Sequence, residues 1–417
     1  RASRTLPRMK LVVLACIPFA SMACAFSVDD DLGVDEHVQA SDVAAVTNDD
    51  AATCAAVARA PLPATCPYEH DVVVWGAEGW NAIAGAFAAD ISPCTDVFVS
   101  IAPSSSDKTK LRANQAASVR TSPQVHAVAE LHFASWSKVH RDQGVSWREI
   151  GHRFRDQMEA AGYCVASGDT WAVNEAPSSL RRSASFRADF AELTQGLAEG
   201  RAGMPFSKGV VFAQDFGHAS TNLSLFKDNE ESMLVDAPFW VKMNNTVRFF
   251  ADEVYADPSH VCMGNTAAVD RRRRVNAYAE HLPKLARAGG DATATARSYL
   301  SRAYLPLLSA AWDAVPEQGY GTTTIPLVEM QRHIRAQVDA TRHFADANNT
   351  PDGRIGFAFV SYHDPVEWDA LASTMANAIR GAYGEGSSSG GACRGEGCSC
   401  AVDGARENTA WLSFGSW

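Results

Sequence analysis

The sequence predicts an α/β protein, specifically a (β/α)8 TIM-like barrel. Short runs of β-branched and apolar residues alternate with longer segments of helical character across residues 67–383. Such alternation is typical of parallel strands joined by crossover helices. Seven or eight strand–helix units in this length suit a closed barrel better than an open sheet. The composition agrees, because 46% hydrophobic and 20% charged residues are ordinary values for a globular domain.

Eight runs are predicted as the barrel strands, each apolar enough for a buried parallel sheet. In chain order they are residues 71–75, 96–101, 125–133, 170–174, 209–213, 259–263, 322–325 and 355–361. The seventh run is short, and it is chosen because that part of the sequence offers no better one.

Three helical segments stand out between these strands. Residues 80–90 form an Ala-rich helix behind the first strand, and residues 147–161 carry a charged amphipathic pattern. Residues 327–345 place apolar side chains at helical spacing ahead of the last strand. Helices at these places are what crossover connections require.

Residues 1–26 are predicted to hold a few upstream residues and a secretory signal peptide. Met9 and Lys10 give a short basic start, and an uncharged apolar stretch leads to Ala23-Cys24-Ala25. This order of features is the pattern of a cleaved export signal. Cleavage after Ala25 and lipidation at Cys24 both stay open. We therefore expect a protein that is secreted or held at the cell surface.

Residues 27–66 are predicted to be a disordered acidic linker. No Lys or Arg occurs between residues 27 and 58, whereas Asp and Glu crowd the segment. Like-charge repulsion and few large apolar side chains keep such a segment extended and solvated. The folded domain is therefore expected to begin near residue 67.

Residues 384–417 are predicted to be a Gly/Ser linker followed by a Cys-containing tail. Cys393, Cys398 and Cys400 follow the linker. The tail resembles the first third of the MYXO-CTERM sorting signal of myxobacterial surface proteins, in which a membrane helix and an Arg cluster follow the Cys motif. The resemblance implies anchoring at the outer surface through a C-terminal segment that this sequence does not contain. A tail closed by disulfides is the alternative.

Net charge and cysteine usage restrict the partners. A formal net charge of −11 argues against a nucleic-acid partner. In an exported chain the cysteines are expected to form disulfides. Cys54 and Cys66 flank a Pro-containing loop and are expected to pair, whereas the pairing of Cys94, Cys164 and Cys262 stays open. No zinc-type Cys/His spacing occurs, so no structural metal and no cofactor are predicted.

The sequence lacks the motifs that identify several large enzyme classes. No predicted strand is followed by G-x-G-x-x-G, by a Walker loop or by G-x-S-x-G, and H-E-x-x-H does not occur. Dinucleotide binding, Walker-type phosphate transfer, serine-hydrolase chemistry and zincin chemistry are therefore not predicted.

The chemistry of a barrel is expected at the carboxyl ends of its strands. Aromatic and polar residues gather at those ends in this sequence. Aromatic faces with polar groups between them suit a sugar ring, whose C–H faces stack while its hydroxyls form hydrogen bonds. A carbohydrate substrate or ligand is therefore predicted. The expected binding residues are Trp75, Glu78, Glu130, His132, Trp136, Trp171 and His363.

The run Thr170–Glu175, followed by Ala176 and Pro177, resembles the fourth strand of clan A retaining glycoside hydrolases. In that family an Asn-Glu pair ends the strand, the Glu being the acid/base and the Asn the partner of the sugar 2-hydroxyl. The resemblance implies these roles for Glu175 and Asn174. They are chemically consistent, because a carboxylic acid protonates the leaving oxygen while the bond to the 2-hydroxyl strengthens in the transition state.

A retaining glycosidase needs a second carboxylate close to the first. The clan takes it from the end of the seventh strand, where this sequence has no strand-like run ending in Glu. Glu317, in the loop before the predicted seventh strand, is one candidate. Asp215, at the end of the fifth strand, is another and would suit an inverting geometry.

Three functions remain in play, and the sequence leaves open whether the chain is an enzyme. The first is a secreted, surface-anchored glycoside hydrolase that acts on a polysaccharide with Glu175 as general acid/base. The second is a non-catalytic surface barrel that binds a glycan or a partner. The third is a metal-dependent hydrolase that uses strand-end carboxylates and histidines. Its candidate residues are Glu130, His132, Asp215, His218, His363 and Asp364.

Overall fold

A computed structural model gives the structure of the chain. It describes residues 70–76, 79–89, 94–177, 179–213, 233, 235–253, 302–309, 354–358 and 367–382, with scattered helical residues between 295 and 338. The predicted signal peptide, acidic linker and Cys-containing tail all lie outside the described residues.

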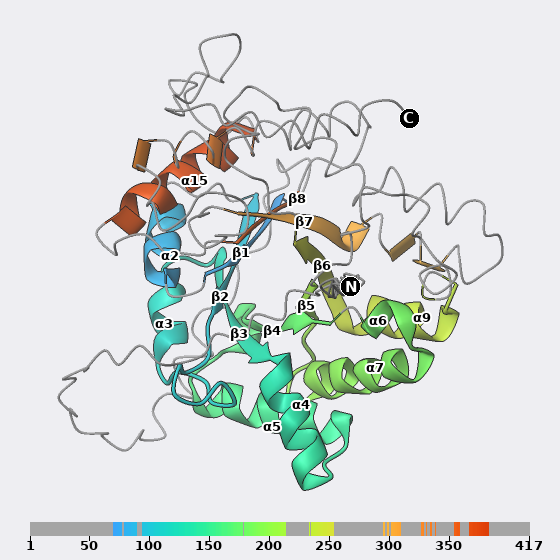
Figure 1. Ribbon diagram of the computed structural model, residues 1–417. Coiled ribbons are helices and arrows are strands. Elements are labelled where there is room, and N and C mark those ends of the chain that lie inside the picture. The colour runs from blue at the N-terminus through green and yellow to red at the C-terminus, as the bar shows by residue number, and fades with distance from the viewer. Residues whose placement is uncertain are drawn as a thin grey trace, which may run out of the picture. The chain divides into compact units, whose positions relative to one another are not determined.

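Eight parallel strands form a hydrogen-bonded ring (Figure 1). Each strand pairs with the next along the chain, and the last pairs with the first, as Val72 with Ile355 shows. The strands are β1 (His70–Trp75), β2 (Thr95–Ile101), β3 (Val125–His132), β4 (Thr170–Ala176), β5 (Gly209–Ala213), β6 (Val247–Glu253), β7 (Tyr304–Ser309) and β8 (Arg354–Ala358).

Helices lie outside the ring and bury their apolar sides against it. They are α2 (Trp80–Ala88), α3 (Gln115–Val119), α4 (Phe133–Gln143), α5 (Trp147–Ala160), α6 (Ser179–Arg182), α7 (Ala184–Glu199), α9 (Ala237–Thr246) and α15 (Trp368–Ala382). In α5, Ser146 accepts a hydrogen bond from the Glu149 amide and so begins the helix. Ile150, Phe154 and Met158 follow at four-residue spacing and are buried.

The last helix packs beside the first. The helices α15 and α2 are in contact, and the Arg380 guanidinium donates to the Ala86 carbonyl over 3.3 Å (Figure 1). This contact joins the two ends of the described chain on the outside of the ring, in the same sector where β8 pairs with β1. Closure is therefore supported by both the sheet and the helical layer.

Two apolar layers hold the ring together. The larger layer lies between the strands and the helices. The smaller layer fills the inside of the ring, as in a packed barrel core. Its members are Val73, Phe98, Val128, Ala172, Val210, Phe212, Phe249, Ala251 and Leu305. Because side chains alternate along a strand, the polar residues two positions beyond Val73, Phe98, Val128 and Ala172 also face inward.

The prediction of a regular (β/α)8 barrel has to be corrected. Strands and helices alternate regularly only from β1 to β6, where six strands accompany seven α-helices. Beyond β6, the described residues contain β7 and β8 with no complete helix between them, and α15 follows β8. The fold is α/β, with a six-strand alternating part that two further strands join into the ring, and the described chain does not show an eightfold β/α repeat.

The predicted positions of the sixth and seventh strands are also wrong. The ladder uses Val247–Glu253 and Tyr304–Ser309 for these places, whereas 259–263 and 322–325 lie outside the described residues. Val247 follows Thr246, the last residue of α9, without any turn residue to mark a boundary. Pro306 lies inside β7 opposite Asp252, although proline normally argues against a central strand.

Candidate functional site

A β-bulge interrupts β4 at the Asn174-Glu175 pair. Val173 pairs with Val211 on β5, but the next matched pair is Ala176 with Ala213. Three steps on β4 therefore oppose two on β5, which is the signature of a bulge. Glu175 occupies this irregularity with a φ of +56°, in the left-handed region that non-glycine residues avoid. The Glu175 side chain therefore does not follow the regular alternation of side chains along the strand.

Glu130 is the centre of a hydrogen-bonded cluster inside the ring. Its Oε2 accepts from the Trp75 indole N–H over 2.7 Å, and its Oε1 accepts from Asn174 Nδ2 over 2.8 Å. The Ser100 hydroxyl lies 3.5 Å from Oε2 and accepts from the Gly76 amide over 3.1 Å. These contacts connect the carboxyl ends of β1 to β4, because every member lies one inward position above the apolar layer.

Burial makes the Glu130 carboxylate costly to ionise. The residue is 3% exposed, and loss of hydration raises its pKa to about 7. The indole of Trp75 and the nearby His132 lower the pKa, while the negative charge of Glu175 raises it. Glu130 and Glu175 therefore interact electrostatically, although only Glu130 is buried.

His132 holds Glu175 in its ionised form. The Ser135 amide donates to His132 Nδ1 over 3.3 Å, so Nδ1 carries the lone pair and the proton resides on Nε2. Nε2 lies 3.2 Å from Glu175 Oε2 and donates to it. This hydrogen bond is the main reason that the pKa of Glu175 is lowered, and the charge of Lys108 adds to it. The Glu175 side chain is 36% exposed and can meet a ligand.

The orientation of the Asn174 amide follows from its neighbour. Nδ2 donates to Glu130, so the Oδ1 atom is left to accept a hydrogen bond from another group. A hydroxyl-bearing ligand beside Glu175 would supply such a donor. Two carboxylates whose surroundings move their pKa values in opposite directions are a pattern that acid–base sites use.

The structure brings together five of the residues chosen from the sequence and separates others. The residues that it assembles are Trp75, Glu130, His132, Asn174 and Glu175. Four further candidates lie outside the described residues, and they are Glu78, Asp215, Glu317 and His363. The same holds for His218 and Asp364, which belong to the metal-dependent hypothesis.

Trp136 and Trp171 are packing residues and not sugar platforms. Trp136 lies on α4 with its ring edge-on to Phe154, and the ring centroids are 6.0 Å apart. Trp171 is fully buried, and its indole N–H donates to the Ser207 carbonyl over 3.1 Å. A sugar ring could not reach either side chain without opening the core, so the prediction that they bind substrate is wrong.

Ser100 is the member of the cluster that sequence reasoning missed. It is the one polar residue after Asp96 in a strand whose other residues from that point are apolar. Its position two residues beyond the inward-facing Phe98 would have placed it among the polar residues at the carboxyl end. The alternation of the strand was therefore a usable signal.

Comparison with known proteins adds no assignment. No protein-family model matches the chain, and no curated protein matches it significantly. In the part of the chain that the structure describes, no group of three or more His, Cys, Asp or Glu residues is placed to hold a metal ion. None of the described helices is both long and apolar enough to span a bilayer.

Proposed function

We propose that this chain is a secreted glycoside hydrolase acting on a polysaccharide, with Glu175 as the carboxylate at the reacting bond. The observation that carries the proposal is the bulge in β4, where the backbone adopts an unfavourable conformation at the Asn174-Glu175 pair itself. Strain of this kind concentrates at active sites and ligand clamps. The resemblance to the fourth strand of clan A glycosidases points to the same two residues.

Glu175 takes the proton-transfer role in this proposal. A carboxylate can accept a proton from an attacking water and return it to the leaving oxygen at another stage of the reaction. His132 favours the ionised form, so the resting site is prepared for the base half of that role. Asn174 Oδ1 would accept a hydrogen bond from the sugar 2-hydroxyl.

Glu130 acts through its neighbours. Both of its oxygens already accept hydrogen bonds, from the Trp75 indole and the Asn174 amide. Glu130 is therefore a positioning residue that fixes the indole of Trp75 and the amide of Asn174. The second carboxylate of the reaction remains assigned to Asp215 or Glu317, outside the described residues.

Export to the outside of the cell is part of the proposal. It rests on the signal-like residues 1–26 and on the sorting-like tail after residue 384. Cys94 and Cys164, both of which are disulfide-bonded, support it as well, because disulfides persist in oxidising compartments.

A non-catalytic glycan-binding barrel is the second candidate. It is favoured by the lowered pKa of Glu175, because an ionised carboxylate cannot donate a proton to a leaving group. Such a barrel would use the same Asn174 and Trp75 surfaces to hold a sugar without cleaving it. The two candidates differ only in turnover.

The test is release of reducing ends from a panel of bacterial and plant polysaccharides by the full-length chain. Glu175→Gln removes the ionisable group while it keeps the size of the side chain, and we expect it to lower the rate by about 10²-fold or more. Glu159→Gln, the same change at an exposed residue of α5, is the matched control and should retain the rate. Equal rates in wild type and Glu175→Gln would refute the assigned role. Polysaccharide binding without cleavage would establish the second candidate instead.

A further inference from the structure

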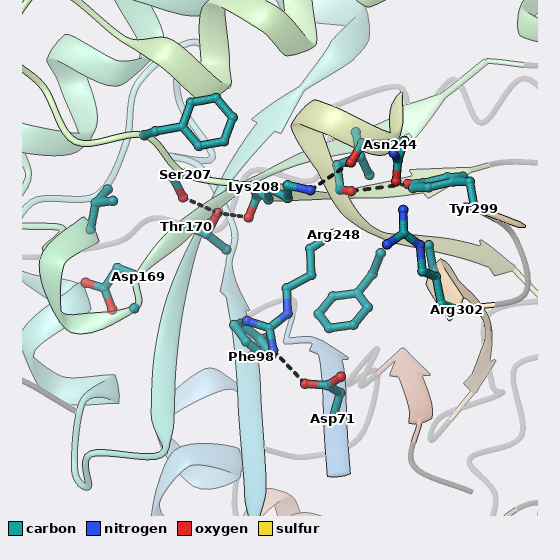
Figure 2. A pocket seen from close by; sticks show the side chains of 16 residues that line it. Asp71, Phe98, Asp169, Thr170, Ser207, Lys208, Asn244, Arg248, Tyr299 and Arg302 are labelled. Carbon is teal, nitrogen blue, oxygen red and sulfur yellow. Dashed lines mark hydrogen bonds and ion pairs between the residues drawn. The ribbon is translucent and has the colours of Figure 1, made fainter. Parts of the chain in front are cut away.

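A cavity of about 530 Å³ opens at the other end of the ring, among the starts of the strands (Figure 2). Asp71 is the second residue of β1, Thr170 begins β4, and Arg248 is the second residue of β6. Lys208 and Arg302 come just before β5 and β7. Because the strands are parallel, these residues lie at the end opposite to Glu175, so the cavity is separate from the candidate hydrolase site.

Positive charge predominates in this cavity. Lys208, Arg248 and Arg302 gather around the same space (Figure 2). Of the two carboxylates in the lining, Asp71 pairs with Arg248 over 2.9 Å, and Asp169 pairs with an arginine outside the lining. Within the described residues, neither Lys208 nor Arg302 forms an ion pair. The lining therefore keeps two cationic groups available for an anion, although the whole chain is acidic.

The three cations are held close to one another. Burial lowers the pKa of Lys208, and the charges of Arg302 and Arg248 lower it further. Arg248 is fixed by its bond to Asp71 and by the rings of Phe98 and Phe249, whose centroids lie 4.6 and 5.1 Å from its guanidinium carbon. An anion entering the cavity would relieve this repulsion without requiring Arg248 to move.

Asn244 adds an acceptor beside these cations. The Lys208 ammonium donates to the Asn244 carbonyl over 2.7 Å, which places the two residues side by side (Figure 2). The Asn244 side-chain Oδ1 is buried and has no hydrogen-bond partner. Buried polar atoms are nearly always satisfied, and this acceptor would gain a partner from a ligand if the Asn244 side chain turned to bring Oδ1 to the surface of the cavity. A hydroxyl group on the same ligand as the oxyanion would provide it.

We propose that this cavity binds a small hydroxylated oxyanion, of the class of sugar acids and sugar phosphates. Lys208 and Arg302 would bind the charged group, and Asn244 Oδ1, once its side chain turned toward the cavity, would accept a hydrogen bond from a ligand hydroxyl. A volume of about 530 Å³ lies within the usual range for small-molecule sites and accommodates a monosaccharide derivative. This site does not depend on whether the chain hydrolyses glycosides.

The experiment is isothermal titration of the full-length chain at low ionic strength and pH 7 with four probes. The probes are glucose 6-phosphate, glucuronate, inorganic phosphate and glucose. We expect binding of at least one hydroxylated anion and none of glucose. Whether the phosphate or the carboxylate binds more tightly identifies the oxyanion. No binding of either hydroxylated anion up to about 10 mM would overturn the proposal.

Variants locate the site. Arg302→Ala should weaken binding more than tenfold, because it removes an exposed cation that makes no ion pair within the described residues. Arg141→Ala is the matched control, since Arg141 is 71% exposed and lies on α4, outside the lining of the cavity. Asn244→Ala should weaken the binding of glucose 6-phosphate but leave the binding of inorganic phosphate unchanged. Unchanged affinity in Arg302→Ala, with native circular dichroism in all variants, would refute the assignment.

Discussion

Replacing Glu175 by glycine and by alanine separates the cost of its backbone conformation from the chemistry of its carboxylate. Glu175 has a φ of +56°, where a Cβ atom crowds the backbone and costs roughly 1–2 kcal/mol. Alanine keeps that Cβ atom and therefore keeps the strain, whereas glycine removes it. In an ordinary strand the order is reversed, since glycine is less favourable than alanine by about 0.5–1 kcal/mol.

The expected magnitudes follow from the contacts. Both variants lose the bond to His132, which is worth about 0.5 kcal/mol because the Glu175 side chain is about a third exposed. Glu175→Ala should therefore unfold with a free energy slightly below that of the wild type. Glu175→Gly should exceed Glu175→Ala by about 1 kcal/mol, because the strain is relieved. Both variants should lose the proposed hydrolysis.

Urea denaturation of the full-length chain measures these differences, provided that the slope of the free energy of unfolding against urea concentration is the same in all variants. Ala172→Gly is the control for the ordinary order, because Ala172 lies two residues earlier on the same strand and is not in the left-handed region. It should lower the free energy of unfolding. If Glu175→Gly proved less stable than Glu175→Ala, the argument from backbone strain would be wrong.

Three further outcomes are expected. The pKa of Glu130 in the folded state is about 7, above the ordinary value of 4.5. Its contribution to the free energy of unfolding therefore declines by up to about 3 kcal/mol as the pH rises from 4.5 to 7, and it is constant above that pH. Glu130→Gln should flatten that decline in urea denaturation series at pH 5 and pH 8, and an unchanged decline would contradict it. His132→Ala should raise the pKa of Glu175, so the limb of the pH profile of the proposed hydrolysis that Glu175 sets should move to higher pH. An unmoved limb would show that His132 does not set the pKa of Glu175. Gly209→Ala should lower the free energy of unfolding by about 2 kcal/mol in urea denaturation, because its Cβ would overlap the ring of Trp171, and a stable variant would show that the ring can shift.

The first five strands could be predicted from the sequence to within two residues. Each is a short buried apolar run between polar or glycine-containing segments, so local pattern and global fold agree. The sixth and seventh strands could not. Val247 continues directly from α9 without a turn, and Pro306 reads as a strand breaker, so tertiary pairing overrides the local signals there.

The candidate site was predictable in its members but not in its geometry. The position of Glu130, His132, Asn174 and Glu175 at strand ends follows from the sequence, because parallel strands end on the same side. The bond between Trp75 and Glu130 spans 55 residues and depends on the register of two pairings, β1 with β2 and β2 with β3, which no local pattern gives. The bulge at Glu175 is likewise a property of the β4–β5 pairing and not of the strand alone.

Two features at the carboxyl ends of the strands lower the stability of the folded state. Glu130 is buried with a raised pKa, and Glu175 adopts a left-handed backbone conformation; both are unfavourable for the folded state. A chain selected only for stability would gain from glycine at the second position. By contrast, the buried pair of His126 and Asp96 is satisfied, with Nε2 3.1 Å from Asp96 and Nδ1 3.1 Å from the Ser167 carbonyl. Buried polar groups alone therefore do not mark a functional site. Glu175 differs from His126 in its left-handed backbone conformation and its partial exposure, which is why the proposed function is placed at Glu175.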